Sequence, residues 1–211
     1  MDLWIDDQLA DPPVDSSPTL SSLIDEVRRR IGGTGRMVVS IECDGVELGA
    51  DRLDRAMTRS VESYERVVMR TCPPAELVEG ALAQALSCLR QSRRQCAGIV
   101  KLIAESNPAE AMSTLAAVLG TWTQVHEGMR NSIGLLGQDV AQLSTDEVDI
   151  ERTFQEVREL LIQIKEVVEA RDTILLADLL QYELDPVADQ WERAIRRVRD
   201  HAAELIPACT A

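Results

Sequence analysis

The feature that most constrains the fold of this sequence is a rhythm of apolar residues at alternating spacings of three and four, which begins near Pro74 and continues to Leu205. It is longest in the second helix that it predicts, where it passes through Met112, Leu115, Leu119, Trp122, His126, Met129, Ile133, Leu136, Val140 and Leu143. Spacing of this kind is typical of α-helices that pack along one apolar face, as in a coiled coil. We expect four such helices.

The first two helices are separated by a strong stop and restart signal. The first helix is expected from about Pro74 to Ser106. Asn107-Pro108 then offers a side-chain cap and a proline at the first helical position. From there the apolar rhythm predicts one uninterrupted helix to Leu143.

The last two helices have their own boundary signals. Ser144-Thr145-Asp146-Glu147 matches a capping box and predicts the start of the third helix. The fourth is expected from near Asp172, and Pro186 within it predicts a kink or break at Asp185. Because the connections are only two or three residues long, each helix must turn back on its neighbour. We therefore predict an antiparallel four-helix bundle over residues 73–211.

Residues 1–72 have a different, mixed pattern. Ser17-Pro18 is expected to open a helix that runs to Ile31, and Asp44-Gly45 predicts a tight hairpin between two strands. The expected order is strand, strand, helix, strand, strand, strand. This order resembles the ubiquitin-like β-grasp fold, in which a mixed sheet wraps one helix. The segment continues into Pro73-Pro74 without a free diglycine tail, so the resemblance implies a docking domain. The predicted fold class is α+β.

Charge excludes some classes of partner. Acidic residues outnumber basic ones by 36 to 22, and the formal net charge is −14. A protein that binds nucleic acid must neutralise several phosphates, so we expect no nucleic-acid partner. No uncharged apolar run approaches the roughly 20 residues that span a bilayer. Because Met1 to Gln8 also lack the pattern of a signal peptide, we expect a cytoplasmic protein with no membrane contact.

Residues that could support catalysis or bind a metal are few. A di-iron site in a helical bundle requires Glu-x-x-His motifs, but Thr123 precedes His126 and Val198 precedes His201 at that position. The five cysteines form no Cys-x-x-Cys pair, and we interpret them as reduced structural thiols. Gly32-Gly33 follows a helix, whereas a phosphate-binding loop precedes one. We expect no metal, no cofactor, no catalytic residue and no enzymatic activity.

His126 occupies a core position in the second helix of the predicted bundle. A histidine at such a position usually shares a hydrogen bond with a neighbouring helix, and we interpret His126 in this way. Two alternatives stay open, a role as a ligand-binding or catalytic residue and a role as a pH-sensitive switch.

Residues 175–191 are apolar most of the way around the helix, with Asp178, Tyr182 and Asp185 on one side at spacings of four and three. Trp191 and its apolar neighbours are either core residues or part of a partner-binding groove that the kink opens. Trp4, on a short strand near the N-terminus, is a second candidate contact, or else packs against the helix at 18–31. We predict that Trp4, Asp178, Tyr182, Asp185 and Trp191 contact a partner.

The same segment resembles a stretch of uncharacterised bacterial helical-bundle proteins, some of them associated with flagellar genes. The chain is also similar in class and charge to export chaperones of the flagellar apparatus. These resemblances imply a flagellar or secretion component as the protein partner.

Three functions remain in competition. The leading hypothesis is a non-enzymatic protein-interaction protein, an adaptor or a chaperone-like protein. The second is a small-molecule binder or enzyme that uses the bundle core around His126. The third is a self-assembling structural protein, since the apolar rhythm also suits a homodimer.

Overall fold

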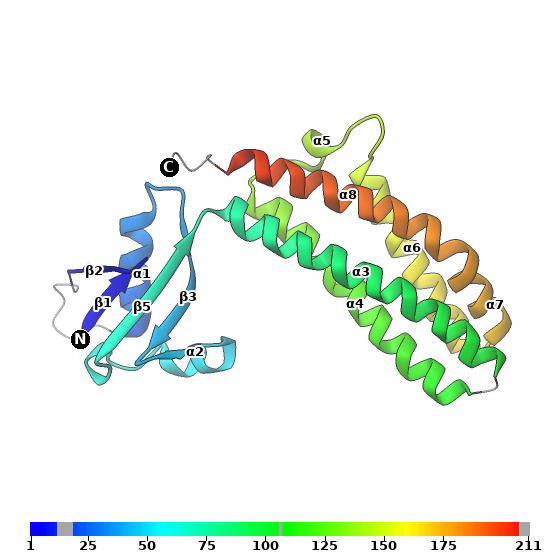
Figure 1. The fold of residues 1–211 in the computed structure, drawn as a ribbon, viewed down its shortest axis with the longest axis horizontal. Coiled ribbons are helices and arrows are strands. Elements are labelled where there is room, and N and C mark those ends of the chain that lie inside the picture. Colours follow the sequence, from blue (N-terminus) through cyan, green and yellow to red (C-terminus); the bar gives the residue numbers. More distant parts are fainter. Residues whose placement is uncertain (12–18, 106, 207–211) are drawn as a thin grey trace. The chain divides into compact units, whose positions relative to one another are not determined.

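The computed structural model describes residues 1–11, 19–105 and 107–206. The fold is α+β, and the chain divides into two compact units, Met1–Pro74 and Ala75–Ala211 (Figure 1). All described strands lie in the first unit, and every regular element described in the second unit is helical. The division falls directly after the Cys72-Pro73-Pro74 segment, where the composition of the sequence changes.

The first unit is built on a five-stranded mixed sheet with the strand order β2-β1-β5-β3-β4. β1 pairs with β5 in parallel, and the neighbouring pairs are antiparallel. The strands are β1 (Asp2–Ile5), β2 (Gln8–Ala10), β3 (Met37–Cys43), β4 (Val46–Glu47) and β5 (Arg66–Cys72).

The predicted hairpin at Asp44-Gly45 is confirmed. Both residues have positive φ, 51° and 81°, as a two-residue turn between twisted strands requires. The Asp44 carboxylate accepts hydrogen bonds from the backbone N–H groups of Glu65 and Arg66, each at 2.9 Å. The turn is thereby tied to the start of β5.

One long helix, α1 (Leu20–Ile31), supplies the core on one face of the sheet. It buries Leu20, Leu23, Ile24 and Val27 in a cluster that also contains Leu3, Val67 and Met69. Thr19 is the N-cap, and its side chain accepts from the backbone of Ser22. The predicted cap, Ser17-Pro18, lies outside the described residues. A short helix, α2 (Ala50–Ala56), and a 3₁₀ turn, Val61–Ser63, connect β4 to β5.

Long helices with one shared apolar core make up most of the second unit (Figure 1). Trp122 and Trp191 are its largest fully buried side chains. The elements are α3 (Pro74–Ala104), α4 (Pro108–Leu135), α5 (Val140–Leu143), α6 (Ile150–Glu169), α7 (Thr173–Asp178), the π-helical turn η2 (Leu179–Glu183) and α8 (Leu184–Leu205).

The prediction of one continuous helix to Leu143 is wrong. α4 ends at Leu135, and Gly137 then adopts a left-handed conformation with φ of 63°. A helix cannot continue through such a residue, which is why glycine is common there. The short helix α5 returns Leu143 to the core at 1% exposure, so the apolar rhythm persists across a turn.

The predicted capping box at Ser144-Thr145-Asp146-Glu147 is also wrong. The box lies instead at Asp139 and Gln142 of α5, and Asp149 caps α6 by accepting from the backbone of Arg152 at 2.9 Å. Ser144 ends α5 and its hydroxyl accepts from the Ile150 N–H at 3.2 Å.

The predicted helix start at Pro108 is confirmed, but the Asn107 side chain does not cap the backbone. Its amide donates to the Glu110 carboxylate at 2.8 Å instead.

Candidate functional site

Two features of the second unit stand out as candidate sites. The first is the segment around η2. The backbone N–H of Leu184 donates to the Leu179 carbonyl five residues earlier, which defines a π turn. Pro186 has no N–H, so the Tyr182 carbonyl lacks its usual α-helical donor. The irregular turn lies just before Pro186, at Leu179–Glu183, and Asp185 lies inside α8, so the predicted break does not fall at Asp185 itself.

Large apolar side chains are exposed along this segment. Ile174, Leu175 and Tyr182 are 77%, 45% and 63% exposed, and we call them the α7 patch. A π turn takes more residues than an α turn, so η2 brings Tyr182 towards the face that carries Ile174 and Asp178. The opposite face holds the segment in place through buried leucines, Leu176, Leu179, Leu180 and Leu184.

An apolar pocket of about 350 Å³ adjoins the α7 patch. Thr173 and Leu176 of α7 form one wall. The other walls come from the start of α4 and the end of α6, and consist of Pro108, Met112, Val167, Val168, Arg171 and Asp172. The patch and this pocket therefore share the short helix α7, with the exposed side chains of Arg171, Asp172 and Asp178 among them.

The residues predicted from the sequence as partner contacts have different surroundings. Asp178 and Tyr182 are exposed. Asp185 is held by Arg93 of α3 at 3.0 Å, so its carboxylate serves an ion pair within the unit. Trp191 is 0% exposed, which matches the interpretation as a core residue and excludes it from a surface groove.

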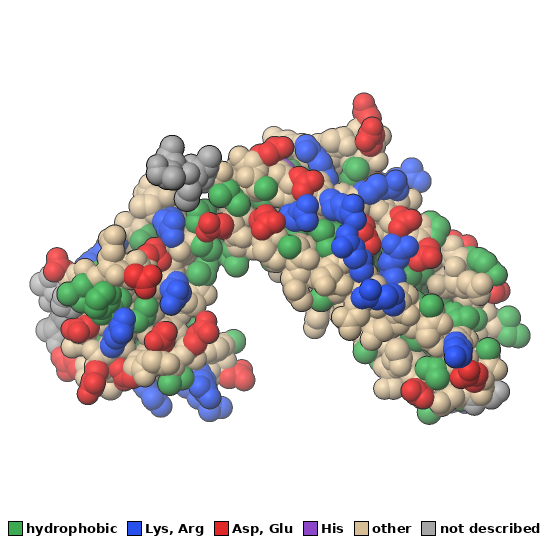
Figure 2. Space-filling view, viewed as in Figure 1, with side chains coloured by type: hydrophobic (Ala, Val, Ile, Leu, Met, Phe, Trp, Pro, Cys, Tyr) green, Lys and Arg blue, Asp and Glu red, His purple; other side chains and the backbone are tan. Residues whose placement is uncertain are grey.

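The ion pair of Asp185 belongs to a larger cluster between α3 and α8. Arg93 also contacts Asp189 at 2.7 Å and Glu192 at 3.4 Å, and Glu192 in turn binds Arg90 and Arg196. Figure 2 shows basic side chains gathered over α3 and α8 with carboxylates among them. This cluster ties two helices together.

Trp4 belongs to the first unit and does not pack against α1 as one alternative expected. Successive strand residues face opposite sides of a sheet, and Leu3 is the residue that joins the α1 core. Trp4 is half-buried on the other face, with the guanidinium carbon of Arg66 at 4.9 Å from its ring centroid. It is therefore covered by a cation–π contact.

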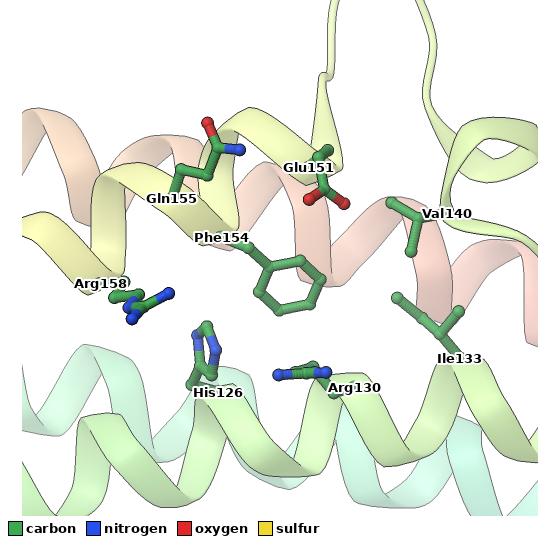
Figure 3. A pocket seen from close by; sticks show the side chains of 8 residues that line it. All are labelled: His126, Arg130, Ile133, Val140, Glu151, Phe154, Gln155 and Arg158. Atoms are coloured by element: carbon green, nitrogen blue, oxygen red, sulfur yellow. The ribbon is translucent and has the colours of Figure 1, made fainter.

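The second candidate site is a pocket of about 420 Å³ between α4 and α6. His126 and Arg130, one turn apart on α4, face Phe154 and Arg158, one turn apart on α6. Figure 3 shows both guanidinium groups approaching His126, with the Phe154 ring beside it. The remaining lining residues are Ile133, Val140, Glu151 and Gln155.

A second pocket of about 430 Å³ continues the first along the same two helices. It shares His126 and Arg158 with the first pocket. Its other lining residues are Thr123, Glu127, Leu161, Ile162 and Lys165. The two pockets form a groove, with His126 at its middle.

His126 does not make the interhelical hydrogen bond predicted for it. The ring packs edge-on against Phe154 at 4.9 Å between centroids and against Trp191 at 6.2 Å. Its Nδ1 atom is buried and has no hydrogen-bond partner within the described part of the chain. Burial lowers the pKa of His126 below 6.5, and the positive charges of Arg130 and Arg158 lower it further, against the opposing effect of Glu127. The neutral ring is thus favoured.

Sequence reasoning did not identify Arg130, Arg158, Ile174 or Leu175 as site residues. Arg130 and Arg158 follow His126 and Phe154 by four residues, and this i, i+4 spacing on two facing helices is the available signal. No comparable signal exists for Ile174 and Leu175, because a leucine-rich helix gives no sign of which residues its neighbours leave uncovered.

Neither site contains an arrangement that would hold a metal. In the described ranges, no group of three or more His, Cys, Asp and Glu side chains is placed to bind a metal ion. None of the described helices has a stretch long and apolar enough to cross a lipid bilayer.

Comparison with known proteins places part of the chain in a family. The model of the family described as a domain of unknown function (DUF8042) matches residues 81–194. This range includes the α7 patch and both pockets around His126. No curated protein and no solved structure matches the chain.

Proposed function

The chain belongs to the DUF8042 family, and from this premise we propose that it is a non-enzymatic protein-interaction protein, an adaptor or chaperone-like protein that binds one protein partner through its helical unit. The observation that carries the proposal is the α7 patch beside its apolar pocket. Single exposed apolar side chains are normal on protein surfaces, whereas a cluster that adjoins an apolar hollow is typical of an interaction site.

Covering the patch would be favourable. Complete burial of one large aliphatic side chain contributes about 1.5–3 kcal/mol. Ile174 and Leu175 lie together at the start of α7, and Tyr182 offers an aromatic ring with a polar tip, which is common at interfaces. The leucines on the buried face hold the segment in position before a partner arrives, so binding orders few side chains.

Charge indicates the chemistry of the partner. Asp178 and Glu183 are exposed beside the patch, and neither has an ion-pair partner among the described residues. Residues 73–211 contain 22 acids and 13 bases, a net charge of −9. An amphipathic helix with Lys or Arg beside its apolar stripe would match the patch in both respects.

The proposal also assigns a fold family to the sheet of the first unit and to the long helices of the second unit. The strand order of the sheet and the parallel β1–β5 pair support a β-grasp docking domain. The common core of α3, α4, α6 and α8 supports an antiparallel four-helix bundle. The resemblance of residues 175–191 makes a flagellar or secretion component of the cytoplasm the first partner to test.

The test uses the tagged full chain to capture proteins from the lysate of its own organism at low and moderate salt. The double variant Ile174→Ser/Tyr182→Ser removes the two most exposed of the three apolar side chains of the patch. Leu135→Ser removes an apolar side chain that is 43% exposed on α4 and lies outside the patch, and it serves as the matched control. We expect one stoichiometric partner with the wild type and the control, and loss of that partner with the double variant.

Equal capture by the double variant would remove the patch from the interaction. Absence of any partner at both salt concentrations would overturn the interaction proposal. Sedimentation equilibrium tests the alternative of self-assembly. If the wild type is a dimer and the double variant is a monomer, the patch is a contact between two copies of this chain.

A further inference from the structure

We propose that the groove between α4 and α6 binds a small organic anion, an acid group with an attached apolar ring or chain, and that Arg130 and Arg158 hold the acid group. This inference concerns a site on helices α4 and α6, and it does not depend on the α7 patch.

The size and lining of the pocket fit such a ligand. The volume of about 420 Å³ lies within the range of small-molecule sites. Phe154, Ile133 and Val140 offer apolar contacts, and the guanidinium groups of Arg130 and Arg158 lie on either side of His126, while the Glu151 carboxylate lies at the Val140 end of the pocket. A ligand with a charged end and an apolar body matches this division.

The two arginines are free to bind an anion. Neither Arg130 nor Arg158 has an ion-pair or hydrogen-bond partner within the described ranges, although the chain carries a net charge of −14. Both guanidinium groups approach the same histidine (Figure 3). A guanidinium presents paired N–H donors that match the two oxygens of a carboxylate or phosphate.

His126 is the second polar group that a ligand in the groove can contact, because the residue lines both pockets. Its Nδ1 atom is buried and closed to solvent, so Nδ1 is not the contact atom. The other ring nitrogen, Nε2, can donate to or accept from a polar group of the ligand, depending on the tautomer of the neutral imidazole.

The experiment is a proton NMR titration of the full chain, which has only two histidines, His126 and His201. The variant His201→Gln assigns the two resonances. The probes are benzoate, phenyl phosphate and, as a neutral molecule of the same shape, benzamide. A bound anion opposes the arginine charges, so we expect benzoate or phenyl phosphate to shift the His126 signal saturably and to raise its pKa. Benzamide is expected to cause neither change.

The two anionic probes distinguish a carboxylate ligand from a phosphate ester. Saturable binding of benzoate alone assigns the groove to carboxylates, binding of phenyl phosphate alone assigns it to phosphate esters, and binding of both supports the shared anion chemistry. The proposal is overturned if neither acid shifts the signal of His126, or if benzamide shifts it equally.

Variants locate the binding. Arg130→Gln and Arg158→Gln are each expected to weaken binding at least tenfold. Arg94→Gln on α3 removes one exposed charge from the same unit outside the groove and is expected to leave the affinity unchanged. Unchanged binding by the double variant Arg130→Gln/Arg158→Gln would overturn the assignment. The variant Ile174→Ser/Tyr182→Ser should still bind the probes, which separates this proposal from the interaction of the α7 patch.

Discussion

Trp122 of α4 and Trp191 of α8 pack in the core of the second unit with ring centroids 5.1 Å apart and planes tilted by 59°. Both are almost completely buried, and the indole N–H of Trp122 donates to the Ser92 hydroxyl of α3 at 2.8 Å. The Ser92 hydroxyl donates in turn to the Leu89 carbonyl. One short hydrogen-bonded chain therefore links α3 to the aromatic pair.

The first prediction concerns this chain. Ser92→Ala leaves the buried N–H of Trp122 without a partner, and an unpaired buried donor costs about 1–3 kcal/mol. We expect the free energy of unfolding to fall by this amount in urea denaturation followed by circular dichroism. Ser113→Ala, on the exposed side of α4, is the control and should change it little. Equal stability of the two variants would contradict the role given to Ser92.

The second prediction concerns the Arg93 cluster. Arg93 is three-quarters buried and binds three carboxylates of α8, of which Glu192 is nearly buried. We expect Arg93→Gln to lower the free energy of unfolding by about 1–3 kcal/mol, because three carboxylates of α8 lose their guanidinium partner and the nearly buried Glu192 keeps only Arg90 and Arg196. Asp189→Asn, at a carboxylate that is 62% exposed, should cost only about 0.2–1 kcal/mol. A larger loss for Asp189→Asn than for Arg93→Gln would contradict this account.

The third prediction is a pH dependence that arises from His126. Its pKa is lowered in the folded protein, by burial first and then by the positive charges of Arg130 and Arg158. Just below pH 6.5, the histidine is therefore protonated more often in the unfolded chain than in the folded protein. This contribution to stability is present above pH 6.5 and is lost as the pH falls towards the lower folded value. Urea midpoints measured between about pH 8 and pH 5 should show the loss. His126→Gln should flatten this part of the profile, whereas His201→Gln should retain it.

The fourth prediction concerns Asp6 in the first unit. Burial alone would raise the pKa of its carboxyl, but hydrogen bonds from the Thr71 hydroxyl and backbone and the charge of Arg36 lower it below 3.8. The ionised carboxylate therefore stabilises the fold above that pH, and this stabilisation is lost as the pH falls through the lower folded value. Asp6→Asn should destabilise the first unit at neutral pH by about 1–2 kcal/mol, with a smaller penalty in acid.

The neighbouring residue offers a control for that measurement. Asp7 also has positive φ, 63°, in the turn between β1 and β2, and it is exposed. Asp7→Asn should leave stability nearly unchanged because asparagine tolerates this conformation. Equal effects of the two substitutions would show that the turn rather than the carboxylate of Asp6 matters.

Much of the fold was predictable because its signals are local. The Asp44-Gly45 hairpin, the start of α4 at Pro108 and the helical character of residues 150–169 follow from turn chemistry and periodicity. The predictions were wrong where one sequence pattern is compatible with two different structures. The rhythm through Leu136, Val140 and Leu143 suits a continuous helix as well as a turn at Gly137 that returns Leu143 to the core.

The candidate sites were predictable only in part. Tyr182 and Asp178 are exposed as their spacing indicated, but Asp185 is occupied by Arg93, which is 92 positions away in the sequence. The meeting of Arg130 with Arg158 likewise depends on the packing of α4 against α6. Such pairings depend on which helices become neighbours.

The sequence by itself determined most of the helical and extended segments, the α+β class and the net negative charge, because periodicity, turn residues and charge act over a few neighbouring positions. Only the tertiary structure decided that Trp191 is buried while Ile174 and Tyr182 remain exposed in the same helical region. All three are large side chains with apolar surface, and the hydrophobic effect acts on each without direction. Their different environments follow from which faces of α7, η2 and α8 the other helices cover.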